Sequence, residues 1–372
     1  MSTKAYFRKL GNPKNKFIEP TNVGKKSAVV LVGNFFSSSL GNRGVCEDLA
    51  AHLLASSWLV FKTSQRLARV SRLIDMFITV WLRRHQYAVA QVDVYSGPAF
   101  LWALAVARLL RLIGKPYVLT LHGGSLPSFA QRWPRSVHYL LRSATAVTTP
   151  SRYLLNKMRP YRADLRVLPN GLDLVRYAYR LRVRPQPRLV WMRAFHDTYN
   201  PLLAPRVVSL LIADFPDVHL TMIGQDKGDG SFRRAQQLAD ARHTMLRGAV
   251  PKTEVSEWLN IADIFLNTTN VDNTPVSVLE AMACGLCIVS TKVGGIPYLL
   301  RDECDALLVP PDDPEAMATA VRRILTEPGL AEYLSKNARR KVEEFDWAII
   351  LPKWEALLTH AADGNATRIQ WG

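Results

Sequence analysis

Short apolar runs alternate with amphipathic stretches along most of this chain, and they do so in two successive series. Strand-like runs separated by helical stretches are typical of β-α-β units, which form parallel sheets. The first series has its apolar runs at 27–33, 88–96, 116–123, 145–151 and 165–171. The second series has them at 187–195, 218–224, 244–248, 261–269, 286–291 and 306–311. The pattern predicts an α/β protein with two parallel sheets.

The segment between the two series, 176–188, is rich in Arg and Pro and has little apolar patterning, so we interpret it as a connector. A chain of 372 residues also exceeds one typical hydrophobic core. We therefore predict a basic tail, an N-terminal domain, a C-terminal domain, and a final helix and tail that pack back on the N-terminal domain. Their expected bounds are 1–26, 27–183, 184–345 and 346–372. Ligands of open parallel sheets bind at the carboxyl ends of strands, so a site is expected in the cleft between the domains.

The cysteines indicate a reducing compartment rather than a disulfide framework, because only four occur in 372 residues. Cys284 and Cys287 form a CxxC pair, which can serve redox or metal chemistry. No second CxxC completes a zinc site, so we interpret Cys284 as the end of a helix and Cys287 as the start of a buried strand. Residues 1–26 lack the apolar core of a secretory signal, and the apolar run at 100–114 is interrupted by two arginines. A cytoplasmic location is expected.

Positive charge is concentrated in the first half of the chain. Residues 1–185 have 29 Lys and Arg against 7 Asp and Glu, whereas residues 186–372 have 19 against 24. This asymmetry indicates an anionic partner, either nucleic acid or an acidic membrane leaflet, and a basic domain without such a partner is the alternative. In residues 62–84 and 129–144, arginines alternate with large apolar side chains at helical spacing, which suits a membrane interface as well as a core. No nucleic-acid-binding module is recognisable, so no nucleic acid is expected.

The most informative motif is "VDNTPVSVLEAMACG" at 271–285. Its two acids, Asp272 and Glu280, are eight positions apart, and a helix is expected to begin between them. A helix N-terminus offers free N–H groups and partial positive charge, which bind phosphate. The carboxylates can accept hydrogen bonds from hydroxyls of the molecule that carries the phosphate. A capping residue, a first-turn proline and a terminal glycine give the expected start and end of the helix: Thr274, Pro275 and Gly285.

This motif and five further segments resemble glycosyltransferase family 4. The further segments are "LCIVSTKVGGIPYLL", "ALLVPPDDPEAMATAV", "TLHGG", "PNGLDLVRY" and "GAVPKTEVSEWLNIADIFLNT", so the resemblance covers most of residues 28–345. It implies the GT-B fold, in which two Rossmann-like domains face each other across a cleft. It also implies transfer of a sugar from a nucleotide sugar with retained anomeric configuration. No metal or other cofactor is expected, and no Asp-x-Asp triplet occurs in the chain.

The resemblance assigns roles to particular residues. His122 in "TLHGG" matches the family's active-site histidine, which contacts the donor sugar, and Arg193 matches an arginine on the donor diphosphate. Asp272 stands at the first of two signature glutamates, beside the anomeric centre, and Glu280 stands at the second, which binds the ribose hydroxyls. His122, Asp272 and Arg193 are therefore the candidate catalytic residues. The remaining positions expected around the donor are Asn273, Thr274, Pro275, Val276, Gly224, Gly248, Gly41 and Gly44.

The chain departs from the family pattern at two places. Its first signature carboxylate is Asp272, one methylene shorter than glutamate. The lysine that the family places a few residues after its arginine is absent, because positions 197–200 read Asp, Thr, Tyr and Asn. His196 or an arginine from elsewhere could supply the missing positive charge. The departures keep open a non-catalytic scaffold that binds a nucleotide or glycan, and a GT-B sugar-nucleotide epimerase is a further alternative.

The interpretation that follows is a retaining glycosyltransferase of the hexosyl type, acting in cell-surface polysaccharide or glycolipid synthesis. Its expected partners are a nucleoside diphosphate sugar, a glycan or lipid-linked acceptor, and an anionic membrane surface contacted by the basic N-terminal domain. The expected location is the cytoplasm, peripheral at the inner face of the cell membrane.

Overall fold

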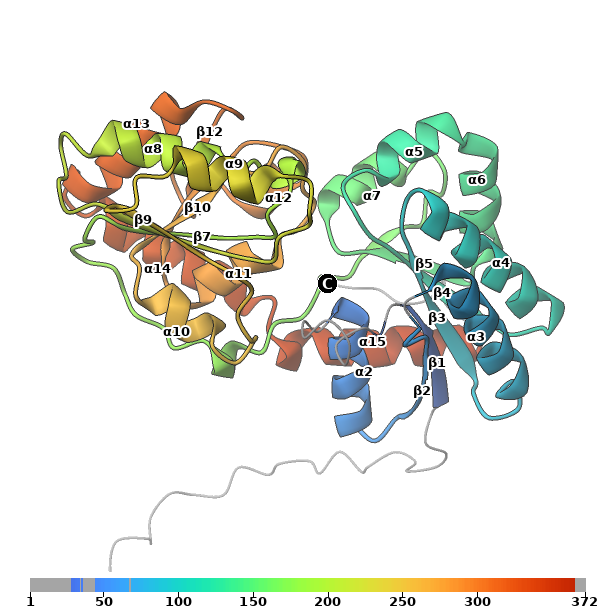
Figure 1. The fold of residues 1–372 in the computed structure, drawn as a ribbon. Coiled ribbons are helices and arrows are strands. Elements are labelled where there is room, and N and C mark those ends of the chain that lie inside the picture. Colours follow the sequence, from blue (N-terminus) through green and yellow to red (C-terminus); the bar gives the residue numbers. More distant parts are fainter. Residues whose placement is uncertain (1–27, 34, 36–43, 67, 365–372) are drawn as a thin grey trace, which may run out of the picture.

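The computed structural model describes residues 28–33, 35, 44–66 and 68–364, and these form two α/β bodies, each built on a six-stranded sheet (Figure 1). The strand order is β2-β1-β3-β4-β5-β6 in the first sheet and β12-β11-β10-β7-β8-β9 in the second. Every strand pair is parallel. The predicted α/β class with two parallel sheets is confirmed.

Within the residues that the structure describes, the first body contains six strands and six helices. Its strands are β1 (Ala28–Val32), β2 (Leu59–Thr63), β3 (Val89–Val94), β4 (Tyr117–Leu121), β5 (Ala146–Thr149) and β6 (Arg166–Val167). Its helices are α2 (Val45–Ala55), α3 (Arg69–Leu82), α4 (Pro98–Leu112), α5 (Leu126–Arg132), α6 (Pro134–Ser143) and α7 (Arg152–Met158).

The second body repeats this alternation. Its strands are β7 (Arg188–Met192), β8 (His219–Ile223), β9 (Thr244–Arg247), β10 (Ile264–Asn267), β11 (Cys287–Thr291) and β12 (Leu307–Val309). Its α-helices are α8 (Leu203–Leu211), α9 (Ser231–Leu238), α10 (Val255–Asn260), α11 (Val276–Ala283), α12 (Ile296–Leu299), α13 (Pro314–Thr326) and α14 (Leu330–Glu343). Two short 3₁₀ turns, η1 (Leu174–Arg176) and η2 (Asp197–Tyr199), precede β7 and α8.

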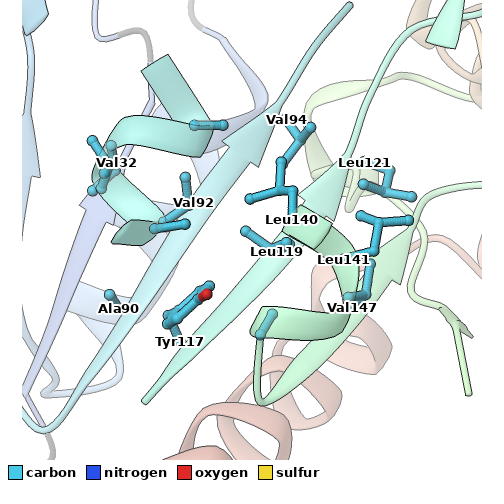
Figure 2. Close-up of a cluster of buried hydrophobic side chains, with 14 of the residues drawn as sticks. Val32, Ala90, Val92, Val94, Tyr117, Leu119, Leu121, Leu140, Leu141 and Val147 are labelled. Atoms are coloured by element: carbon cyan, nitrogen blue, oxygen red, sulfur yellow. The ribbon is translucent and has the colours of Figure 1, made fainter. Parts of the chain in front are cut away.

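Each sheet is buried on both faces, as strand β1 illustrates. Val30 and Val32 pack into the cluster that includes Met76 of α3, whereas Val29 and Leu31 pack into a second cluster on the opposite face. Successive side chains of a strand point to opposite faces, so a strand buried on both sides reads as a continuous apolar run. Figure 2 shows the first of these clusters, where side chains of β1, β3, β4 and β5 meet those of α6.

The last helix, α15 (Trp347–Ala362), leaves the second body and packs against the first (Figure 1). Its apolar side chains, among them Trp354 and Leu357, lie in the same cluster as Val29. Trp347 covers Gly171, where a Cβ atom would lie 2.4 Å from the indole ring. The chain therefore crosses between the bodies twice, once before β7 and once before α15.

The connector before β7 is fixed to the second body by a buried arginine. The Arg182 side chain is fully buried, and its Nε lies 3.3 Å from Oδ1 of Asp263. Arg180 pairs with the same carboxylate at 2.7 Å, and Arg182 also donates to the carbonyl of Ala262. Ion pairs and hydrogen bonds of Arg180 and Arg182 thus anchor this segment, and Tyr177 adds apolar packing in the core of the second body.

The structure corrects some expected elements. Strand β2 was not predicted, and residues 62–84 begin in that strand before α3 starts at Arg69. The expected helix at 129–144 is two helices, because the chain breaks at Trp133, just before Pro134. The interpretation of the CxxC pair is confirmed, since Cys284 caps the end of α11 and Cys287 opens β11, with both thiols buried and free. Within the described ranges, no helix combines the length and apolar character needed to cross a bilayer.

Candidate functional site

A pocket of about 300 Å³ lies between the two bodies and takes lining residues from both. The first body and the connector contribute Val45 and Asp48 of α2 together with Tyr177. The second body contributes the carboxyl ends of its strands and the start of α11. Its predicted site residues in the lining are Arg193, Gly224, Val276 and Glu280.

Glu280 is a buried carboxylate on α11 with one side facing this pocket. Its Oε1 accepts a hydrogen bond from the Tyr177 hydroxyl at 2.9 Å. Burial raises the pKa of Glu280, while the positive charge of Lys252 and the Tyr177 hydrogen bond oppose that rise. A carboxylate keeps unused acceptor positions after accepting one hydrogen bond. Glu280 can therefore accept further hydrogen bonds from hydroxyl groups of a ligand.

Arg193 follows β7 and lies between an acid and an aromatic ring. Its Nη2 donates to Oδ2 of Asp272 at 2.5 Å, and its guanidinium carbon lies 4.1 Å from the ring centre of Tyr199. Its Nε is buried and has no hydrogen-bond partner among the described residues. Burial raises the pKa of Asp272, and the Arg193 charge opposes that shift. The structure thus brings together two of the three predicted catalytic residues and leaves one strong donor of Arg193 unused.

The start of α11 differs from the prediction. The helix begins at Val276, so Pro275 occupies the N-cap position and Thr274 lies outside the helix. A Thr274 cap would need its hydroxyl to reach a free N–H of the first turn, yet Thr274 Oγ1 and Ser277 Oγ are buried without a partner among the described residues. The predicted end is confirmed, because α11 stops at Ala283 and Gly285 adopts a φ of +78°.

The loop before α11 is held by contacts that only small neighbours permit. A Cβ atom on Gly294 would lie 2.2 Å from the Asp272 carbonyl oxygen, and one on Gly295 would lie 1.9 Å from that of Asn273. The amide of Gly295 donates to the Asp272 carbonyl at 2.9 Å. The Ser151 hydroxyl of the first body donates to Oδ1 of Asn273. The "VGGIP" segment therefore fixes the backbone that carries Asp272.

His122 lies at the end of β4 in the first body and is not among the lining residues of the pocket. Its Nε2 lies 3.0 Å from Oδ1 of the buried Asp93, and its ring stacks on Tyr95 with centroids 5.0 Å apart. The His122 loop approaches the second body, because a Cβ atom on Gly124 would lie 3.4 Å from the backbone of Asp272. His122 is thus brought to the same end of the cleft as Asp272, with its ring orientation fixed by Asp93.

The four predicted glycines fall into different environments. Gly224 lines the pocket, and a Cβ atom there would lie 1.6 Å from the Arg193 carbonyl oxygen, so this position requires glycine. Gly248 is not a lining residue, and a Cβ atom there would meet nothing within 4 Å. Gly44 is the N-cap of α2, directly before the lining residue Val45. Gly41 lies outside the described residues.

Several site residues escaped the sequence reasoning. Tyr199 stands in the stretch where the family carries lysine, and it stacks on Arg193 instead of supplying a charge. Lys227 and Lys252 line the pocket, and Lys252 Nζ pairs with Asp48 across the cleft at 2.8 Å. Lysines in polar loops carry no distinguishing pattern in one sequence. Tyr177 was within reach of sequence reasoning, because it ends the quoted segment "PNGLDLVRY".

Two Rossmann-like bodies that face each other across a shared pocket define the GT-B class of fold. The family model described as "Glycosyl transferases group 1" matches residues 183–341, and the "Glycosyltransferase Family 4" model matches residues 50–176. The chain therefore belongs to glycosyltransferase family 4, and the predicted resemblance is confirmed.

Relatives of known name are distant in sequence. The chain is 22% identical to the D-inositol 3-phosphate glycosyltransferase of Streptomyces avermitilis over 294 residues, which are 72% of this chain and 63% of that protein. It therefore spans less than two thirds of the length of that relative. It is 26% identical to the phosphatidyl-myo-inositol mannosyltransferase of Mycolicibacterium smegmatis over 280 residues, 73% of this chain and 70% of that protein.

Alignments with solved structures cover a larger share of this chain than the sequence alignments do. Sucrose-phosphate synthase from Thermosynechococcus elongatus superposes with a TM-score of 0.72 at 19% identity, covering 89% of this chain and 98% of that one. Anabaena HepE, solved in complex with UDP and glucose, gives a TM-score of 0.69 at 16% identity, covering 90% and 100%. Both likenesses concern the fold alone, and they confirm its GT-B class.

Proposed function

We propose that the protein transfers a sugar from a nucleoside diphosphate sugar to a glycan or lipid-linked acceptor, with retention of the anomeric configuration. The observation that carries this proposal is the pairing of a hydroxyl acceptor with an anion donor in one pocket. Glu280 offers a buried carboxylate, and Arg193 offers a buried Nε without a partner among the described residues. A nucleoside diphosphate presents ribose hydroxyls and a diphosphate to match these two groups.

In this proposal Glu280 accepts hydrogen bonds from the ribose, and the Tyr177 hydroxyl holds the carboxylate in place. Arg193 Nε and the backbone N–H groups at the start of α11 face the diphosphate. Charge that develops on the leaving diphosphate is stabilised by these donors, which are fixed before the reaction begins. Lys252 and Lys227, rather than His196, are the nearest candidates for the second cation, because both line the pocket.

His122 and Asp272 are proposed to act at the sugar end of the donor. Asp93 accepts from Nε2 of His122 when that nitrogen carries the proton, which leaves Nδ1 as an acceptor for a sugar hydroxyl. Asp272 accepts a hydrogen bond from Arg193. Retention rests on the family resemblance. Nuclear magnetic resonance of the first product formed tests it, and an inverted anomer would refute it.

The proposal includes catalysis without a metal ion. In the part of the chain that the structure describes, no three His, Cys, Asp or Glu side chains gather where they could hold one. The positive charge that a metal would bring to the diphosphate is assigned here to Arg193 and the lysines. Turnover that survives EDTA supports metal independence, and turnover lost to EDTA and restored by Mg²⁺ refutes it.

We place the protein in the cytoplasm, peripheral at the inner face of the cell membrane, in cell-surface polysaccharide or glycolipid synthesis. The support is the basic first half of the chain, with 29 Lys and Arg against 7 Asp and Glu in residues 1–185. A lipid-linked acceptor would be held at such a surface. Fractionation of cells tests the location, since the protein should pellet with membranes and leave them at high salt.

The deciding experiment is calorimetric titration of the protein with UDP, GDP, ADP, CMP and TDP, alongside the Glu280→Ala variant. One diphosphate should bind to the wild type, and the variant should bind it far more weakly. UDP is the first to test, because the HepE structure carries it. If no nucleotide binds to the folded protein, the donor site is refuted.

A non-catalytic scaffold is the second candidate, and one observation favours it. Arg193 and Asp272 are engaged with each other, and the shorter acid stands where the family has glutamate. Binding of a nucleotide sugar without transfer, hydrolysis or epimerisation over prolonged incubation would establish the scaffold. Any of these turnovers that depends on Arg193 would exclude it, and epimerisation without an acceptor would identify the epimerase.

A further inference from the structure

Helix α3 presents large apolar side chains to solvent along one stripe. The exposed fractions are 73% for Val70, 53% for Ile74, 50% for Ile78, 45% for Trp81 and 64% for Leu82. Spacings of three and four residues place these side chains on one face of a helix. We name these five residues the outer stripe.

The opposite face of α3 already supplies the contacts with its own body. Arg72, Met76 and Val80 are buried, and the last two pack in the core cluster of the first sheet. Arg72 lies over the Trp102 ring of α4 at 4.8 Å and donates to the carbonyl of Arg66 at 2.9 Å. The outer stripe is therefore not needed to fold the helix onto the sheet. Contiguous exposed apolar surface of this kind marks an interaction site.

Positive charge surrounds the stripe. Residues 64–150 contain eleven Lys and Arg but only two acids, Asp75 and the buried Asp93. Four arginines flank the two ends of α3: Arg66, Arg69, Arg83 and Arg84. An apolar stripe with cations at both ends of its helix suits an interface that is apolar within and anionic at its rim.

The neighbouring helices continue this surface. In Figure 1, α4 lies beside α3 and α6 lies beyond it on the same outer side of the first body. Leu101 and Leu112 of α4 are exposed, and Arg111 donates to the Tyr139 hydroxyl of α6 at 2.9 Å. A hollow of about 840 Å³ at α6 is lined by four basic side chains, Arg111, Arg135, His138 and Arg142.

We propose that α3 docks the protein on an anionic lipid bilayer, with the outer stripe at the acyl boundary and the flanking arginines on headgroup phosphates. This deepens the membrane association in the proposed function and identifies the surface that makes it. An amphipathic helix parallel to the bilayer plane binds through the sum of buried apolar area and electrostatic attraction. The α4 and α6 arginines then face further headgroups.

The same observations disfavour other partners. A nucleic acid would meet the arginines but leave the five apolar side chains exposed to water. A second copy packed stripe to stripe would bring the arginines of two chains close together, where like charges repel. A bilayer accommodates both parts of the surface at once.

The test is co-sedimentation of the full chain with vesicles at about 0.1 M salt. One set is phosphatidylcholine with about 40% phosphatidylglycerol, and the other is phosphatidylcholine alone. The wild type should bind the anionic vesicles only. The double variant Ile74→Ser and Ile78→Ser should bind them about tenfold more weakly or worse. The matched control is Ile261→Ser on the second body, which is 48% exposed, against 50% for Ile78, and should bind as the wild type does.

A second variant pair separates the electrostatic part. Arg83→Gln with Arg84→Gln should also weaken anionic-vesicle binding, and its residual binding should depend less on salt than that of the wild type. Nucleotide affinity should be unchanged in every variant, because neither the outer stripe nor Arg83 and Arg84 line the donor pocket. This separates failure of the docking surface from failure of the proposed transfer.

The proposal is overturned if the Ile74→Ser and Ile78→Ser variant binds anionic vesicles as tightly as the wild type. It is also overturned if the wild type is a dimer without lipid that this variant converts to a monomer, since the stripe would then face a second copy. Binding of RNA but of no vesicle would overturn it in favour of a nucleic-acid partner.

Discussion

The two bodies place a similar arrangement on opposite sides of the cleft. In the first body, buried Asp93 contacts His122, whose ring stacks on Tyr95. In the second body, Asp272 contacts Arg193, whose guanidinium stacks on Tyr199. Each side therefore fixes a basic group between a carboxylate and an aromatic ring.

The difference lies in the basic group. A guanidinium stays charged at any physiological pH, whereas an imidazole can be neutral and can both donate and accept. The second body thus offers permanent positive charge beside the pocket, which suits a diphosphate. The first body offers a group that suits the hydroxyls of a sugar. The following variants test this division from the largest expected effect to the smallest.

Removing the charge on the second side should have the largest effect. Arg193→Gln should lower kcat/KM by about a hundredfold to a thousandfold, because a donor aimed at the leaving group is worth that much in a water-poor site. Steady-state kinetics measures it. Arg206→Gln, at an exposed position of α8, is the control and should leave turnover unchanged. Equal kcat/KM values for the two variants would refute the proposal that Arg193 stabilises the leaving diphosphate.

Displacing the Arg193 backbone should have the second-largest effect. Gly224→Ala places a Cβ atom where the Arg193 carbonyl stands, so the free energy of unfolding should fall by about 2–3 kcal/mol, with loss of nucleotide binding. Gly248→Ala has open space and should change it by less than about 0.5 kcal/mol. Denaturant unfolding compares the two. Similar stabilities would mean that the loop after β7 moves aside freely.

Removing the negative charge of Glu280 should weaken nucleotide binding more than it slows the chemical step. Glu280→Gln should lower nucleotide affinity by about tenfold to a hundredfold, the effect of one or two hydrogen bonds to a charged group. Calorimetry measures it, with Glu257→Gln at an exposed position of α10 as the control. Unchanged nucleotide affinity in Glu280→Gln would refute the proposed contact between the ribose and Glu280 of α11.

On the first side, Asp93→Asn should lower kcat/KM by about tenfold by loosening the orientation of His122. A double-mutant cycle identifies the route of the effect. In a His122→Ala background, Asp93→Asn should cost almost nothing further in kcat/KM. Independent, multiplying losses would mean that Asp93 acts on the fold or the ligand without His122.

The smallest effect is in pH dependence. Burial raises the pKa of Glu280, so nucleotide binding by its charged form should fall on acidification at a pH above 4.5, the ordinary value. Glu280→Gln should lack this step. A carboxyl group whose pKa is raised in the folded state adds stability below its unfolded pKa and loses it as pH rises through the folded pKa. The variant should therefore gain stability relative to the wild type as pH rises, which unfolding at pH 5 and pH 8 would show.

Most strands could be read from the sequence, and one could not. Eleven of the twelve strands that the structure describes correspond to the expected apolar runs. Central strands such as β1 and β3 are largely apolar because they are buried on both faces. The missed strand, β2, is a sheet edge whose Leu59 is exposed and whose Lys62 faces solvent, so it lacks that signal. The buried Arg182 was equally hidden, since arginine in a connector reads as a solvent-exposed residue until its carboxylate partner is known.

For the site, the sequence indicated residues but not their contacts. The motif "VDNTPVSVLEAMACG" follows a strand and carries Glu280, and this local order was sufficient to predict a phosphate-binding helix. Asp93 was missed because it lies 29 residues before His122 and meets it only through the pairing of β3 with β4. The start of α11 was predicted one residue early: Pro275 is the N-cap, and the Thr274 hydroxyl has no hydrogen-bond partner among the described residues.

The sequence by itself determined the two-sheet architecture, the family and the helix that carries Glu280, because strand burial and helix signals are local and periodic. The tertiary structure alone decided which side chains share the cleft. It paired Lys252 with Asp48 and Tyr177 with Glu280, and it turned the stripe of α3 to solvent. The physical reason is that each of these features depends on segments far apart in the chain. Lys252 meets Asp48 only where the two bodies face each other. Tyr177 meets Glu280 across 103 residues of sequence, and a helix face stays exposed only where no other element covers it.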